Sequence, residues 1–163
     1  MRRLALGALV SALLTTSPAF AAGPNKLVGT WKPVSATIDS QGTSTDIYGP
    51  QPGGQLIFTA DLQYSVVLHD RRIPKFVSNA RGQGTDAENR AAFNGSMALY
   101  GSYTVDAKGE FTGNTVEGST FPNWIGDKRT RRELSMTVEG NRMTESFQRP
   151  SGPRIKIVWE RVR

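Results

Sequence analysis

The sequence predicts an all-β protein: an eight-stranded antiparallel up-and-down β-barrel with one short helix covering a mouth. Turn residues punctuate the chain at short, even intervals from residue 27 onward. Between these turns, apolar side chains recur in steps of two, which is the period of a half-buried strand. The motifs at residues 29–31 (Gly-Thr-Trp) and 159–161 (Trp-Glu-Arg) suit the first and last strands of a barrel that meet and close it.

Eight segments have the length and the alternation of strands. Gly, Asn and Asp in the tight connections supply the positive φ angles that hairpin turns need, so strands that follow one another should pair antiparallel. Full closure removes both exposed edges of such a sheet, which favours a barrel over an open sheet. The predicted strands are residues 27–37, 54–60, 63–70, 98–106, 110–119, 128–138, 142–148 and 154–161.

One segment departs from the strand pattern. Thr85 and Glu88 have the spacing of a capping box, and residues 89–93 continue with helical composition until Asn94 and the following glycine end the helix. We expect this short helix to cover one mouth of the barrel. The preceding loop, residues 71–84, is either a mobile lid or a passive crossover between the third and fourth strands.

The N-terminus carries the pattern of a secretory signal peptide. Arg2 and Arg3 precede an apolar run, and residues 19–21 (Ala-Phe-Ala) form a cleavage motif, so we expect residues 1–21 to be removed and residues 22–163 to form one domain. The apolar run is too short for a bilayer-spanning helix. The chain has no cysteine, which excludes disulfides and a lipid-anchored N-terminal cysteine. The expected location is periplasmic or secreted.

Charge and composition exclude several classes of function. The formal net charge is +6, two units of which belong to the signal peptide, and the only basic cluster spans residues 128–132. A modest, dispersed excess of positive charge favours a role in solubility over nucleic-acid binding. His69 is the sole histidine, so a two-histidine metal site is excluded and the sequence predicts neither a metal nor a cofactor. No catalytic triad is present.

Short motifs follow one another along the mature chain at residues 27–32, 48–50, 54–59, 103–106, 116–119, 122–126, 131–132 and 159–161. This ordered set resembles the lipocalin-like domain family of small bacterial and fungal barrel proteins. The resemblance implies a lipocalin-like barrel, and members of the family mostly lack an assigned activity. This chain departs from the family at Asn114 and Thr115, where histidine is frequent.

Two charged residues within predicted strands are candidates for the barrel interior. Glu117 lies between Val116 and Gly118, and Arg132 shares a strand face with Leu134 and other apolar residues. If both side chains point inward from adjacent strands, they form a buried ion pair. Such a pair adds little stability because desolvation offsets the attraction, so it would indicate contact with a polar ligand group. The alternative places either residue on the outside of the barrel.

The aromatic residues divide into two groups. Trp31 and Arg161 are expected to form a structural latch at the closed end, with the guanidinium stacked over the indole. Trp124 belongs to a loop in which a large apolar side chain must cap the mouth or lie exposed. The candidate pocket walls, each of which could equally be plain core, are Phe58, Tyr103, Trp124 and Phe147.

Three functions are compatible with these patterns. The first is an exported protein that binds a small hydrophobic or amphipathic molecule, since an eight-stranded barrel is just wide enough for one. The second is a cofactor-free isomerase or cyclase-like enzyme that uses Glu117, a tyrosine such as Tyr103 and the shape of the cavity. The third is a protein-interaction module with a filled barrel. The sequence favours binding and leaves the ligand and the oligomeric state open.

Overall fold

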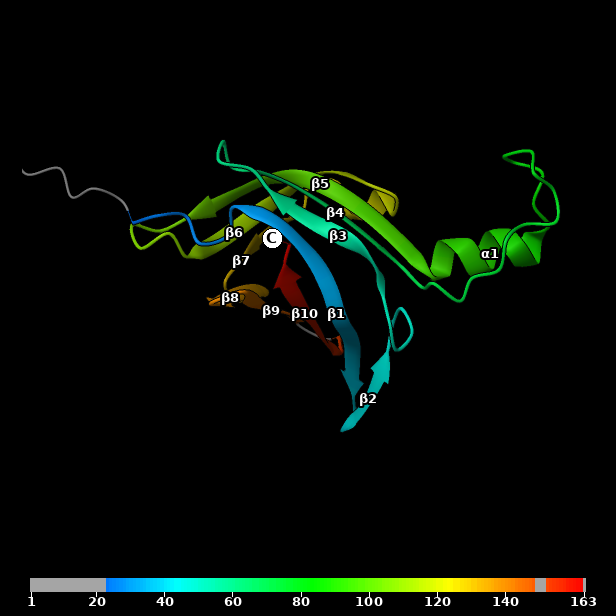
Figure 1. The fold of residues 1–163 in the computed structure, drawn as a ribbon, viewed down its shortest axis with the longest axis horizontal. Helices are drawn as coiled ribbons and strands as arrows, with labels where there is room; N and C mark the ends of the chain where they lie inside the picture. The colour runs from blue at the N-terminus through cyan, green and yellow to red at the C-terminus, as the bar shows by residue number, and fades with distance from the viewer. Residues whose placement is uncertain (1–22, 149–151, 163) are drawn as a thin grey trace, which may run out of the picture.

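The computed structural model describes residues 23–148 and 152–162, and it confirms the all-β barrel class. Antiparallel strands curl into a nearly closed barrel, and a single α-helix lies outside it (Figure 1). The strands are β1 (Gly29–Ser40), β2 (Thr43–Asp46), β3 (Gly53–Phe58), β4 (Gln63–His69), β5 (Ser96–Val105), β6 (Phe111–Ser119), β7 (Lys128–Thr130), β8 (Leu134–Glu139), β9 (Arg142–Gln148) and β10 (Arg154–Arg161); α1 is Asp86–Asn94, and a 3-10 turn, η1, is Pro122–Trp124.

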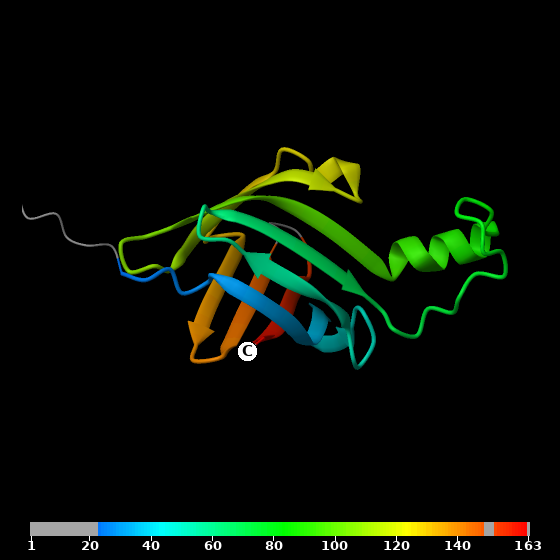
Figure 2. The same cartoon turned by 45° about the horizontal axis from the view of Figure 1, so that its top comes forward.

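The strands pair in the order β7-β6-β5-β4-β3-β1-β10-β9-β8, with β2 paired to β1 beside this path. All of these pairs are antiparallel, as predicted. The first and last long strands are neighbours, and Trp31 is in register with Arg161. This pairing brings the start of β1 and the end of β10 together, while β7 and β8 form the two ends of the hydrogen-bonded path (Figure 2).

Two strands differ from the prediction. The segment 128–138 divides into β7 and β8, because the carboxylate of Glu133 accepts hydrogen bonds from the backbone N–H and the hydroxyl of Thr130, at 2.9 and 2.6 Å. This local turn stops the strand, so β7 pairs with β6 whereas β8 pairs with β9. The second difference is β2, which forms a hairpin with β1 through Gln41 and Gly42, both at positive φ.

Helix α1 begins at the predicted capping box, but it does not lie over a mouth of the barrel as predicted. The Thr85–Glu88 capping box is present, with both reciprocal hydrogen bonds. The helix and the loop before it extend beyond the end of β4 and β5, away from the barrel, so α1 does not cover a mouth (Figures 1 and 2). The reason is its composition: no residue of α1 is buried, and its one large apolar side chain, Phe93, is 53% exposed. Without an apolar face, nothing drives the helix onto the barrel.

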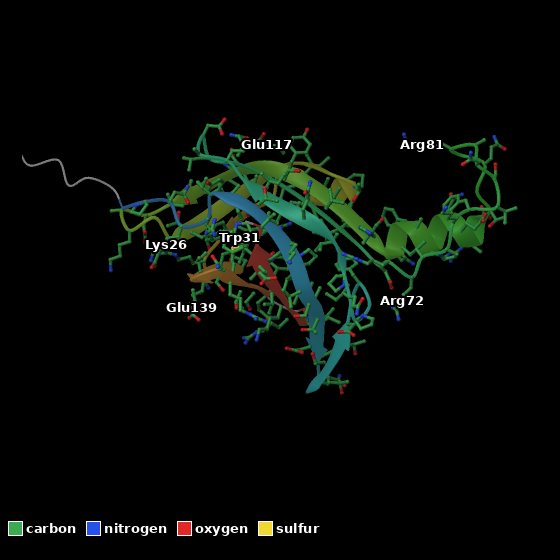
Figure 3. All side chains as sticks on the ribbon, in the orientation of Figure 1. Lys26, Trp31, Arg72, Arg81, Glu117 and Glu139 are labelled. Atoms are coloured by element: carbon green, nitrogen blue, oxygen red, sulfur yellow. The ribbon has the colours of Figure 1, made fainter. Side chains whose placement is uncertain are left out.

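The core follows the inward faces of the strands. In β4, for example, Tyr64, Val66 and Leu68 are buried while the residues between them are exposed. Trp31 lies inside the barrel in Figure 3, and both it and Trp159 are fully buried. The proposed signal peptide falls outside the described residues, and across the described ranges no helix is long and apolar enough to cross a membrane.

Candidate functional site

A cavity of about 140 Å³ lies inside the barrel, and neither Trp31 nor Arg161 lines it. An engineered apolar cavity of about 150 Å³ in another protein binds benzene, so this space suits a ligand of similar size. Its walls are predominantly apolar. The lining residues are Ile38, Ile47, Tyr48, Leu56, Tyr64, Val66, Met97, Leu99, Asn114, Trp124, Arg129, Leu134, Met136, Glu145, Phe147, Ile155, Ile157 and Trp159.

Two of the predicted pocket aromatics line this cavity and two do not. Trp124 and Phe147 are part of its wall. Phe58 and Tyr103 pack against each other in the closed end of the core, with ring centroids 4.8 Å apart. The Tyr103 hydroxyl donates to the carbonyl of Thr59 and accepts from the amide of Asn25, both at 2.7 Å. These bonds give Tyr103 a structural environment rather than a pocket-facing one.

The predicted inward pair of Glu117 and Arg132 is not formed, and both residues are exposed. In β6, Asn114 and Val116 point inward, so strand alternation places Glu117 on the outer surface (Figure 3). Arg132 lies in the turn between β7 and β8, where the two-residue period on which its placement depended is interrupted. Neither side chain lines the cavity.

The charged residues that do line the cavity are Arg129 and Glu145, which the sequence reasoning missed. Strand β9 contained a usable signal for Glu145, because it lies between Met143 and Phe147 on the same apolar face. An acidic residue flanked in this way must either be buried or disrupt the strand. For Arg129 there was no such signal, since its inward position depends on where β7 ends.

Glu145 is held by a single well-defined hydrogen bond. The indole Nε1–H of Trp159, on the neighbouring strand β10, donates to its Oε2 at 2.9 Å. Burial in the apolar cavity raises the pKa of Glu145 above the ordinary value of 4.5, while the bond from Trp159 and the nearby charge of Arg129 partly oppose the shift. At a given pH, a larger fraction of Glu145 is therefore protonated than of a glutamate at the surface.

Arg129 is nearly buried, with 11% of its side chain exposed. Its guanidinium Cζ lies 4.9 Å from the ring centroid of Phe147 and 5.7 Å from that of Trp124. One terminal nitrogen reaches Asp127 at 3.4 Å. Its Nε has no hydrogen-bond partner within the described residues, although it is buried. A buried donor without a partner is costly, and a ligand oxygen would satisfy it.

Asn114 and Tyr64 form a second polar group in the cavity wall. The Asn114 amide donates to the Tyr64 hydroxyl at 2.9 Å, and this hydroxyl donates weakly to the carbonyl of Thr115 at 3.5 Å. Burial raises the pKa of Tyr64 to about 12, and burial with the charge of Glu145 raises that of Tyr48 to about 12 as well. Both phenols are therefore neutral at physiological pH. The Asn114 Oδ1 has no hydrogen-bond partner among the residues that the structure describes.

An open groove lies outside the cavity and shares part of its wall. The groove has a volume of about 460 Å³, and its polar residues include Asp127, Lys128 and Glu133. Trp124, Arg129 and Phe147 line both spaces. Three side chains thus separate the interior from an exposed groove beside β7.

The opposite end of the barrel is closed by tight contacts. The Arg161 guanidinium stacks over Trp31, with Cζ 4.0 Å from the ring centroid. It also donates hydrogen bonds to the carbonyls of Val28 and Lys26. The Trp31 indole N–H donates to the carbonyl of Leu27 at 2.8 Å. This geometry is consistent with the latch that the paired end motifs suggest.

The described part of the chain, residues 23–148 and 152–162, contains no group of three His, Asp or Glu side chains that could hold a metal ion. His69 is exposed at the end of β4, apart from the cavity.

Comparison with known proteins identifies one family. A family model described as a lipocalin-like domain matches residues 28–162, which include every strand and the cavity. No curated protein and no solved structure matches the chain.

Proposed function

Because the chain belongs to the lipocalin-like domain family, we propose that it binds a small, mainly apolar molecule that carries one polar group. The single observation that carries this proposal is a mostly apolar cavity of about 140 Å³ whose wall includes Arg129 Nε and Asn114 Oδ1, buried polar atoms that have no hydrogen-bond partner among the described residues. A filled barrel that serves only as an interaction module would leave no such space. The cavity therefore favours ligand binding over the interaction module.

The chemistry of the ligand follows from these two atoms. Within residues 23–148 and 152–162, the Arg129 Nε–H donor and the Asn114 Oδ1 acceptor have no hydrogen-bond partner. A hydroxyl group can accept from the first and donate to the second, whereas a hydrocarbon can satisfy neither. The favoured ligand is a compact ring or short chain that carries a hydroxyl or a similar neutral polar group. Neutral character is favoured because the cavity already holds one cationic and one acidic side chain.

The test compares benzyl alcohol with toluene, two molecules of similar shape that differ in one hydroxyl group. Two of the three tryptophans, Trp124 and Trp159, line the cavity, so binding can be followed by tryptophan fluorescence and checked by calorimetry. Asn114→Leu removes the acceptor at similar volume. We expect it to weaken benzyl alcohol binding by about fivefold relative to toluene, the equivalent of one neutral hydrogen bond of about 1 kcal/mol.

A matched pair of variants tests the location. Ile155→Phe fills the cavity, whereas Val67→Phe adds the same ring at a position on β4 that is 42% exposed. We expect only Ile155→Phe to abolish binding of both probes. Equal effects of the two phenylalanines, or no binding by the wild type, would contradict the proposed site.

We also propose that the protein is exported to the periplasm or secreted. This proposal is supported by the residues of the N-terminal segment alone, namely the two arginines, the apolar run and the cleavage motif. N-terminal sequencing of the protein recovered from its host is expected to begin at Ala22. A mature chain that begins at Met1 would contradict it.

A further inference from the structure

The cavity holds the parts of a proton-transfer site as well as those of a binding site. Arg129 from β7 and Glu145 from β9 both line it. Within the described chain no ion pair joins them, although the charge of Arg129 partly opposes the rise in the pKa of Glu145. Two opposite charges that share a small cavity without neutralising each other are expensive to bury. They are therefore available to a third molecule placed between them.

Glu145 has the setting of a general base. Trp159 holds one carboxylate oxygen at 2.9 Å and fixes the orientation of the group. The surrounding wall is apolar, which destabilises the carboxylate and makes it a stronger base than an exposed one. This arrangement lets Glu145 accept a proton from carbon and return it, because the hydrogen bond from Trp159 orients the carboxylate while the apolar wall favours the protonated form more than water does.

Arg129 has the setting of an electrostatic stabiliser. Its stacking on Phe147 and Trp124 fixes the guanidinium plane, and its buried Nε–H has no partner within the described residues. A preorganised donor of this kind stabilises negative charge that develops on an oxygen during reaction. The stacking restricts the movement of the donor, so little reorganisation is needed.

We propose that this cavity catalyses cofactor-free allylic isomerisation of a small β,γ-unsaturated ketone, with Glu145 as the general base and Arg129 as the stabiliser of the enolate oxygen. The inference rests on the proposed function, because it places the substrate in the same cavity. It adds a reaction to binding and assigns Glu145 and Arg129 roles in that reaction.

The reaction is balanced within the substrate and Glu145. The carboxylate removes a proton from the carbon between the carbonyl and the double bond, and the electron pair of that C–H bond moves toward the carbonyl oxygen to form a dienolate. Arg129 Nε–H donates to this oxygen. The protonated Glu145 then delivers the proton to the γ carbon, the double bond moves into conjugation with the carbonyl, and the carboxylate is restored. No oxidant, reductant or second substrate is required.

The probe is 3-cyclohexen-1-one, whose ring is comparable in size to benzene and whose product, 2-cyclohexen-1-one, is detected by its ultraviolet absorbance. We expect the full mature chain to isomerise it at least about 100-fold faster than the same concentration of acetate, the lower end of what a positioned base contributes. Glu145→Gln should reduce the rate to that of the protein-free reaction. Glu139→Gln, which alters an exposed glutamate at the end of β8, should leave it unchanged.

A second variant and a pH profile separate catalysis from folding. Arg129→Met, which keeps most of the apolar stem, should lower the rate by about 10²-fold or more while the far-ultraviolet circular dichroism spectrum stays that of the wild type. The wild-type rate should rise as Glu145 loses its proton. The other titratable or charged groups that line the cavity are Arg129, Tyr48 and Tyr64. Burial raises the pKa of both tyrosines to about 12, so neither phenol changes charge near neutrality.

Binding of the product, 2-cyclohexen-1-one, is measured in parallel by tryptophan fluorescence. Binding without acceleration over acetate, or a Glu145→Gln variant as active as the wild type, would overturn the isomerase proposal alone. A folded wild type that binds neither the product nor benzyl alcohol would overturn the proposed function, and the isomerase proposal with it. Acceleration that depends on both Glu145 and Arg129 supports the isomerase proposal.

Discussion

The closed end and the cavity end of this barrel are built from the same kinds of residue and differ in how their polar atoms are satisfied. At the closed end, defined by Trp31, Phe58, Tyr103 and Arg161, the indole, the phenol and the guanidinium all donate hydrogen bonds to backbone carbonyls. At the cavity end, near Arg129, two buried polar atoms have no hydrogen-bond partner among the described residues. Satisfied polar groups stabilise a fold, whereas unsatisfied ones weaken it unless a ligand completes them.

The largest expected effect comes from the indole at the centre of the closed end. Trp31 is completely buried, so Trp31→Ala should lower the free energy of unfolding by about 3 to 5 kcal/mol. Trp124→Ala, at the partly exposed cavity wall, should cost clearly less. Urea unfolding followed by circular dichroism measures both. An equal loss in the two variants would remove the energetic distinction between the two ends.

Replacing the Arg161 guanidinium of the latch should have a smaller effect on the free energy of unfolding. Arg161→Lys keeps the positive charge and loses the planar group that stacks over Trp31 and reaches two backbone carbonyls. We expect a loss of about 1 to 2 kcal/mol in the same unfolding assay. Arg142→Lys, at an exposed position on β9, is the matched control and should be nearly neutral. A neutral Arg161→Lys would show that the stacking contributes no net stability.

At the cavity end, removing the carboxyl group of Glu145 should increase stability at higher pH, whereas the substitutions at the closed end lower it. The pKa of Glu145 is raised in the folded protein, so its contribution to stability is complete below the unfolded value of 4.5 and declines as pH rises through the folded pKa. Glu145→Gln removes this decline. The stability of the variant relative to the wild type should therefore increase as pH rises above the unfolded value of 4.5. A difference that does not vary with pH would contradict the raised pKa.

The smallest expected effect belongs to an exposed ion pair that is part of neither end. Asp106 accepts hydrogen bonds from Arg131 and from two backbone N–H groups, which lower its pKa to about 2. Its stabilising contribution is present above the unfolded value of 3.8 and is lost as pH falls toward 2. Asp106→Asn should lower the melting temperature slightly at neutral pH, and this difference should vanish near pH 2. An NMR titration of Asp106 with a pKa near 4 would contradict this assignment.

Local patterns predicted the fold better than the site. Strand alternation, hairpin turns and the capping box at Thr85 all depend on residues close in sequence, and each is present in the structure. The inward orientation assumed for Arg132 failed because the turn held by Glu133 interrupts the strand period. The inward orientation predicted for Glu117 was wrong because the face that a strand residue occupies depends on the register with neighbouring strands, which alternation alone does not determine.

By itself, the sequence determined the class of this protein: an antiparallel barrel whose first and last long strands meet at Trp31 and Arg161. Periodicity and turn chemistry are local, and they limit the possible folds to very few. The tertiary structure alone decided which charges enter the barrel, because Arg129 and Glu145 are brought to one cavity by the register of strands that are distant along the pairing path. It also decided that α1 stands clear of the barrel, since a helix without an apolar face gains nothing by packing there.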